Sequence, residues 1–197
     1  MMLPIVTERL ILRAWRREDR APFAAMNADP EVMRYFPEML DEADSNAAVD
    51  RFERYFAESG ITFYAAEEQA SGQFVGTIGM RHAPANLPVA PVIEVGWRLA
   101  AHVWNRGYAT EGARAVVCAA FTLLEAPRVL AFTTPPNTAS RRVMEKVGLV
   151  RDAARDFDHP DLPEDHPMRR HVVYSRERDD WLASPVARIA LAQGSAP

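Results

Sequence analysis

A glycine-containing turn is the first stretch whose residue types suggest chemistry; it covers residues 104–112, WNRGYATEG. A strand-like run, residues 92–99, precedes it, and a helical run, residues 113–124, follows it. The first amides of a helix lack backbone partners and carry the positive end of its dipole, so they suit phosphate. Gly107 would let an anion approach the backbone closely. From these residues alone, the stretch is either a phosphate site or an ordinary helix start.

A loop with acids and histidines and the single cysteine also carry reactive side chains, but they indicate neither a metal site nor a nucleophile. Residues 157–168 form a proline-broken loop with acids and two histidines, and their spacing matches no compact metal-ligand motif. We therefore expect no metal, and a solvated loop. The single cysteine, Cys118, lies in an apolar helical run, which indicates a buried inert thiol rather than a nucleophile.

The composition limits the class of protein. With 197 residues, 48% hydrophobic and 25% charged, the chain is long enough for one globular domain with a core. A net charge of −4 argues against nucleic-acid binding as the main function, and one cysteine excludes an intrachain disulfide. No run approaches the 18 apolar residues that suggest a membrane span, and the N-terminus is too short for a signal peptide. The expected location is the cytoplasm.

The front part of the chain predicts helices between strands. Gly76 and Gly79 lie inside one expected strand, which indicates a bulge or a close backbone approach. Three sequential strands with short connections predict an antiparallel meander. The expected elements are a strand at 7–13, a helical run from 15, a helix start at 29–31, a helix at 44–59 and strands at 61–67, 74–81 and 92–99.

The rest of the chain continues the alternation. Asn137 is expected to cap a helix, and Gly148 to end it in the left-handed conformation. The order predicts an α+β fold in a single domain, 1–197, with a core of about 7–176 and a helical tail at 177–197. The expected elements are the helix at 113–124, a strand at 128–133, the helix from 137, strands at 149–155 and 171–175 and a helix at 178–193.

Three segments, in order, resemble the GNAT N-acyltransferase superfamily, especially the branch of bacterial ribosomal-protein N-terminal acetyltransferases. Residues 7–13, TERLILR, look like that branch's opening strand. Residues 94–99 and 104–111 are similar to the acetyl-CoA motif, with Trp104 where Gln or Arg is usual. Residues 137–149, NTASRRVMEKVGL, look like the Asn-x-x-Ser block, with Leu149 for Phe.

The resemblance implies a fold and a donor site. The fold is a mixed, mostly antiparallel, twisted sheet of about seven strands, flanked by helices and splayed between the fourth and fifth strands. The donor is acetyl-CoA, with its pyrophosphate on the amides of residues 105–110 and its pantetheine along the strand before them. The implied cofactor-binding residues are Trp97, Arg98, Leu99, Asn105, Arg106, Gly107, Tyr108, Ala109, Thr110, Asn137 and Ser140.

Acetyl transfer to an amine needs a base for the amine and a proton or hydrogen bond for the leaving thiolate. Glu94 is the expected base; otherwise it is a strand carboxylate that pairs with Arg98 or Arg81. Asp158 or His159, in an acidic loop that would attract a cationic amine, are alternative bases. Relatives often use a tyrosine acid after the Gly-Phe, but residues 148–157 contain none. Ser140 is the expected substitute, and the more distant Tyr174 the second option.

The predicted function is therefore an acetyl-CoA-dependent N-acetyltransferase. Its acceptor would be a protein N-terminus or a small amine, and the front helices and the loop at 157–168 would decide which. The alternative is a non-catalytic acyl-CoA-binding sensor, which the missing tyrosine favours slightly. No nucleic-acid, membrane or metal partner is expected, and the resemblance also admits a homodimer.

Overall fold

The computed structural model describes residues 4–193, which fold into two compact units. Within the described residues, the first unit contains residues 4–80 together with Gly96–Ala113. The second contains Arg81–Val95 and residues 114–193. The predicted single domain over 1–197 stays a prediction, and the expected loose end at 194–197 lies outside the described residues.

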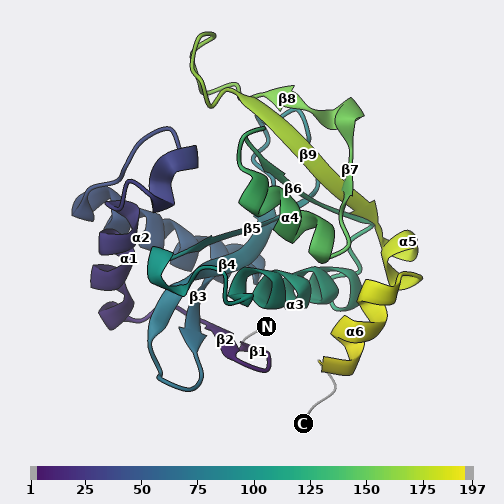
Figure 1. The fold of residues 1–197 in the computed structure, drawn as a ribbon, viewed down its shortest axis with the longest axis horizontal. Helices are drawn as coiled ribbons and strands as arrows, with labels where there is room; N and C mark the ends of the chain where they lie inside the picture. Colours follow the sequence, from purple (N-terminus) through teal and green to yellow (C-terminus); the bar gives the residue numbers. More distant parts are fainter. Residues whose placement is uncertain (1–3, 194–197) are drawn as a thin grey trace. The chain divides into compact units, whose positions relative to one another are not determined.

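The first unit holds an antiparallel group of strands and the front helices. β2 pairs with β1 and with β3, and β3 pairs with β4, all antiparallel. Figure 1 shows α1 and α2 side by side. In chain order this unit contains β1 (Ile5–Val6), β2 (Leu10–Arg13), the 3-10 turn η1 (Arg17–Asp19), α1 (Arg20–Asn27), η2 (Val32–Tyr35), α2 (Glu42–Ser59), β3 (Phe63–Glu68), most of β4 (Phe74–His82), the second half of β5 (Ile93–Leu99), η3 (Ala101–Val103) and the start of α3 (Tyr108–Thr122).

Apolar side chains from the front helices and β3 form the core of the first unit. Trp15 stacks on Phe52 and meets the edge of Phe23, with ring centroids 5.8 and 4.9 Å apart. Asp41 caps α2 by accepting from the amide of Asp44, and Gly60 ends that helix with a φ of 76°. The predicted end of this helix at Gly60 is confirmed, and its start lies two residues earlier than predicted.

The glycines of β4 confirm the expected bulge and close approach. The register between β3 and β4 shifts between Ala66 and Glu67, opposite Gly76. A Cβ on Gly76, whose φ is 146°, would lie 2.3 Å from the carbonyl oxygen of Arg98. A Cβ on Gly79 would lie 2.1 Å from the carbonyl oxygen of Thr62. No side chain fits at either position, so the neighbouring backbones can approach.

The second unit is built around β9. β9 pairs antiparallel with β6, β7 and β8, and Figure 1 shows α4 beside β6 and β9. β5 pairs in parallel with β6 at two positions only, as the predicted splay of these strands requires. Besides the first half of β5 and the rest of α3, the unit contains β6 (Arg128–Thr133), α4 (Thr138–Lys146), β7 (Val150–Arg151), η4 (Ala153–Arg155), β8 (Phe157–Asp158), β9 (Arg170–Glu177), α5 (Arg178–Leu182) and α6 (Pro185–Gln193).

The α+β class and the mixed sheet are confirmed, with three differences in detail. The described residues contain nine strands instead of about seven, because β1 and β8 add two short strands of two residues each. The loop predicted at 157–168 therefore begins after β8, and it extends beyond the β8–β9 pair (Figure 1). The tail predicted as one helix is broken before Pro185. Proline has no backbone N–H to continue the preceding helix, and it stands at the first position of α6.

Candidate functional site

The turn before α3 is the candidate anion site of the first unit. Asn105 and Gly107 have left-handed φ values of 61° and 86°. The amide of Glu111 donates to the carbonyl of Gly107 over 3.0 Å, so the amides of residues 108–110 come before the first helical donor. α3 begins at Tyr108, five residues before the predicted start at 113. The amides assigned to phosphate, those of residues 105–110, therefore lie partly before α3 and partly in its first helical turn.

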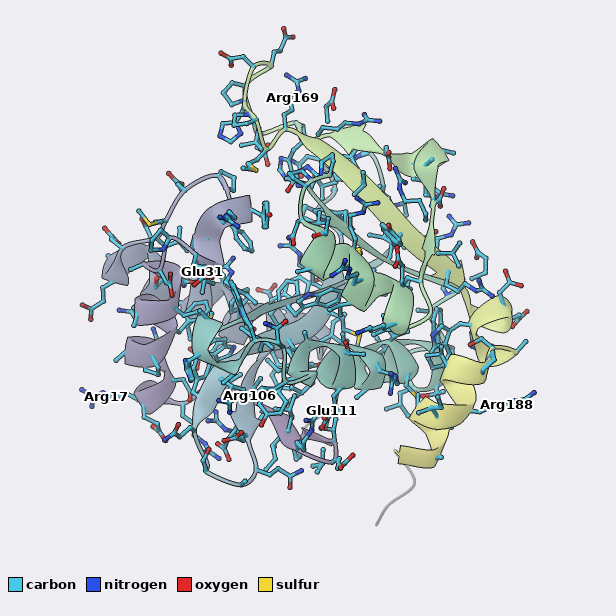
Figure 2. The ribbon with its side chains drawn as sticks, viewed as in Figure 1. Arg17, Glu31, Arg106, Glu111, Arg169 and Arg188 are labelled. Atoms are coloured by element: carbon cyan, nitrogen blue, oxygen red, sulfur yellow. The ribbon has the colours of Figure 1, made fainter. Side chains whose placement is uncertain are left out.

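Arg9 and Glu111 hold this turn in place. The carboxylate of Glu111 accepts from the amide and Nε of Arg9, both over 2.7 Å, and from the hydroxyl of Thr7 over 2.6 Å. Nη1 of Arg9 donates to the carbonyl of Arg106 over 2.9 Å. Figure 2 shows Arg106 and Glu111 near one another at the start of α3. Sequence reasoning missed this contact, because the two partners lie about a hundred positions apart and no local signal connects them.

Two further contacts fix where the turn lies in the first unit. The indole N–H of Trp104 donates to the carbonyl of Leu99 over 2.8 Å, which connects the turn to the end of β5. A Cβ on Gly112 would lie 2.5 Å from Cδ1 of Ile78. Gly112 therefore serves close packing of α3 on β4 rather than anion binding.

The side chain of Arg98 is directed toward the front helices. Its Nη1 donates to Oδ1 of Asn27, at the end of α1, over 2.5 Å. Its guanidinium carbon lies 3.9 Å from the centre of the Phe36 ring. The two expected donor-site segments, residues 97–99 and 105–110, thus share the first unit, but the Arg98 side chain contacts α1 and the residue after η2.

Glu94 is a buried carboxylate in the second unit. Its Oε2 accepts from Nε of Arg81 over 2.9 Å, so it pairs with one of the two arginines considered from the sequence. Only 8% of the residue is exposed. Burial raises the pKa of Glu94, while the charges of Arg81 and His159 act in the opposite direction. A carboxyl group with a raised pKa suits proton transfer near neutral pH.

The loop between β8 and β9 brings two histidines together. The rings of His159 and His171 lie 5.4 Å apart, and His171 stacks on Phe157 at 5.3 Å. Burial lowers the pKa of His171, and its Nδ1 faces the carbonyl of Arg169 over 3.0 Å. Figure 2 labels Arg169 where the loop leads into β9. His159 and Glu94, two alternative bases from the sequence, therefore lie in one unit and interact electrostatically.

The third alternative base, Asp158, has different surroundings. It lies on β8 with its side chain half-exposed, 3.3 Å from the guanidinium of Arg170 and 4.0 Å from that of Arg169. Asp158 is thus engaged by two arginines at a half-exposed position, whereas Glu94 is buried beside one arginine.

Asn137 and Ser140 lie at the start of α4. Oδ1 of Asn137 accepts from the amide of Ser140 over 3.2 Å, and its Nδ2 donates to the hydroxyl of Thr133 over 2.9 Å. Asn137 is the predicted N-cap, and Gly148 has the expected left-handed φ of 88°. Among residues 4–193, no hydrogen bond is made by the Ser140 hydroxyl, which leaves it available to a ligand.

Tyr174, the second candidate acid, connects β9 to α4. Its hydroxyl donates to Oε1 of Glu145 over 3.1 Å and accepts from Nε of Arg141 over 3.2 Å. The residue is 2% exposed. These bonds give Tyr174 a positioning role for the helix that carries Ser140.

The single cysteine contributes neither to the turn before α3 nor to the residues around Glu94. Burial raises the pKa of the Cys118 thiol, which makes the thiolate scarce. Within the described part of the chain, no three His, Cys, Asp or Glu side chains are grouped so that they could hold a metal ion. Across the same residues, no helix is both long and apolar enough to span a membrane.

The chain matches a known domain family and a curated relative with a named activity. The acetyltransferase (GNAT) domain family matches residues 9–150. FsC-acetyl coenzyme A-N(2)-transacetylase of Aspergillus fumigatus is 32% identical over 184 residues, which cover 89% of this chain and 77% of that protein.

Solved structures share the fold. An acetyltransferase of the GNAT family from Bacillus anthracis is 25% identical, with a TM-score of 0.75 over 90% of this chain and 99% of that one. RimJ of Mycobacterium smegmatis, solved in complex with CoA-disulfide, is 21% identical, with a TM-score of 0.71 over 94% of this chain and 89% of that one.

Proposed function

Because this chain belongs to the GNAT acetyltransferase family, and is therefore an acyltransferase, we propose that it moves the acetyl group of acetyl-CoA to a primary amine. The amine attacks the thioester directly in a ternary complex. The observation that supports this proposal most is the turn before α3, whose amides precede the first helical bond and whose shape Arg9 and Glu111 fix. Such a preformed set of amides suits a pyrophosphate.

The proposed donor-binding residues follow from the family motif and from their contacts. The amides of residues 105–110 bind the pyrophosphate, and the backbone of residues 97–99 pairs with pantetheine. Asn137 and Ser140 contact the pantetheine amide and the thioester. The hydroxyl of Ser140 supports its assignment because no described residue bonds to it.

The proposed chemistry uses one base and one donor. Glu94, with its raised pKa, takes a proton from the acceptor ammonium, directly or through water, so that the free amine can attack, and His159 is the alternative acceptor of this proton. A carbon–nitrogen bond forms and the thioester carbon–sulfur bond breaks. Ser140 donates a hydrogen bond or proton to the leaving thiolate, and positioning supplies much of the rate.

Thiol release from acetyl-CoA, measured with a panel of primary amines and peptides, tests the proposal. We expect release that depends on the amine, together with a product whose mass increases by one acetyl group. Tight binding of acetyl-CoA without turnover of any amine would instead support a non-catalytic sensor. Replacing Ser140 with Ala should lower turnover while acetyl-CoA still binds.

A further inference from the structure

Arg98 carries a positive charge that no contact in its unit neutralises. Its guanidinium donates to the amide oxygen of Asn27 over 2.5 Å and lies 3.9 Å from the ring centre of Phe36. Both of these neighbours are neutral. Among the residues that the structure describes, no carboxylate forms an ion pair with Arg98, and its Nε is enclosed without a hydrogen-bond partner.

Arg13, a buried arginine of the same unit, shows the usual arrangement. It pairs with Asp19 over 2.7 Å and with Glu67 over 2.6 Å. Buried charges normally have such partners, because a charge removed from water without compensation is costly. Burial alone lowers the pKa of Arg98 to about 10, with no neighbouring acid to oppose it. An uncompensated cation of this kind is typical of a binding site for an anion.

The neighbours of Arg98 indicate which ligand would bring the anion. Asn27 ends α1 and Phe36 follows η2, so the guanidinium lies against the connection between α1 and α2. The phosphates of acetyl-CoA are assigned to the turn before α3, where the free amides at the start of the helix already suit an anion. The contacts of Arg98 therefore point to the acceptor rather than to the donor.

We propose that Arg98 binds a carboxylate on the amine acceptor, so that the substrates are amines which also carry a carboxylate, such as amino acids. This inference rests on the proposed function. A guanidinium has five donors in one plane, and it binds carboxylates more strongly and with more directional preference than a neutral donor does. The face of Phe36 holds the guanidinium plane, and Asn27 fixes one of its nitrogens.

Matched sets of acceptors test this proposal with the full-length protein. Each set contains an amino acid, its carboxamide and the amine left after removal of the carboxylate. We expect kcat/KM for the acid to exceed that for its carboxamide by about tenfold or more. Arg98→Met should abolish this preference through the KM for the acceptor, without changing the KM for acetyl-CoA. Arg98→Lys should keep part of the preference.

Thermal melting separates binding from a structural role. Because Arg98 is an uncompensated charge, Arg98→Met should melt at the same temperature as the wild type or higher. Arg20→Met is the matched control, since Arg20 on α1 pairs with Asp50 and Glu53, and it should leave acceptor preference unchanged. A lower melting temperature for Arg98→Met, with all acceptors reduced equally, would show a purely structural Arg98 and overturn the proposal.

Two outcomes with the wild type distinguish this inference from the proposed function. If amines are acetylated but carboxamides and decarboxylated amines react as well as the acids, the carboxylate proposal is wrong and the acetyltransferase proposal survives. If acetyl-CoA binds and no amine in any set is acetylated, both proposals are wrong.

Discussion

Nε of Arg81 donates to the carboxylate of Glu94 over 2.9 Å, so the proposed base is buried beside a cation. Burial raises the pKa of Glu94, and Arg81 limits the rise. The two effects together set the pH at which the base becomes active. The acid limb of the profile of kcat/KM against pH should therefore lie above the ordinary carboxyl range of about 4.3.

Replacing Arg81 with Met should move this acid limb to higher pH. The change removes the cation that opposes burial, so the pKa of Glu94 rises further and less of the base is ionised at a given pH. The measurement is kcat/KM for an amine across pH. Arg128→Met, which breaks the pair with Glu177 at a half-exposed site, is the control and should leave the limb in place. A shift to lower pH would contradict the assignment of Glu94.

Replacing Glu94 with Gln should lower kcat by about a hundredfold or more, because proton transfer loses its acceptor.

Glu94 should also make the stability of the protein depend on pH. The pKa of Glu94 is higher in the folded than in the unfolded state, so its contribution to stability is present below the unfolded pKa and is lost as pH rises through the folded pKa. Relative to the Gln variant, the wild type should thus lose melting temperature as pH rises.

Replacing Glu111 with Gln should weaken acetyl-CoA binding. The change removes the charge that holds the Arg9 side chain, and Arg9 in turn holds the turn through the carbonyl of Arg106. The Kd for acetyl-CoA should therefore rise by about tenfold. Calorimetric titration with acetyl-CoA measures this change. Glu125→Gln, at an exposed ion pair with Arg178, is the matched control with an unchanged Kd. An unaltered Kd in Glu111→Gln would mean that the turn keeps its shape without the clamp.

Replacing Gly107 with Ala should impair both stability and donor binding. A side chain at a φ of 86° costs about 1 to 2 kcal/mol, and the new Cβ would lie 3.3 Å from Nη2 of Arg9. Gly72→Ala is a useful comparison, because its φ is 68° and nothing lies within 4 Å of the added Cβ. Both variants should lose similar stability to denaturant, but only Gly107→Ala should bind acetyl-CoA more weakly.

Ser140→Ala and Tyr174→Phe should separate the two candidate acids. Tyr174→Phe removes the hydroxyl that Glu145 and Arg141 share, so it should cost about 1 kcal/mol of unfolding free energy. Its kcat at temperatures well below melting should stay near the wild-type value. Ser140→Ala should show the reverse pattern, with lower kcat and unchanged stability. A large loss of kcat in Tyr174→Phe alone would make Tyr174 the acid.

Local signals in the sequence predicted the parts of the fold that depend on neighbours in the chain. Asn137 and Gly148 bound α4 as predicted, because an N-cap side chain and a left-handed glycine act within one turn. Gly76 and Gly79 marked real close approaches. Boundaries were less accurate: α3 starts at Tyr108, since a glycine such as Gly112 inside a helix reads as a break in the sequence although it packs on Ile78.

Contacts between distant segments could not be predicted in the same way. The Arg9–Glu111 contact joins the first strands to α3, and no periodicity or spacing connects the two residues. The sequence left Arg98 and Arg81 as possible partners of the Glu94 carboxylate, and only the folded structure identifies Arg81 as the partner. The burial that gives Glu94 and Arg98 their unusual pKa values is likewise a property of packing and not of local sequence.

The close contact at Gly76 has a practical consequence for redesign. The backbone of β5 at Arg98 rests against a position that has no side chain, so its place depends on a contact that rotamer changes cannot adjust. Asn27 and Phe36 contact the side chain of Arg98 and take no part in the backbone contact at Gly76. A library confined to the α1–α2 connection should therefore diversify acceptor range while the donor half of the enzyme keeps its geometry. The same library placed at position 76 should yield mostly misfolded protein.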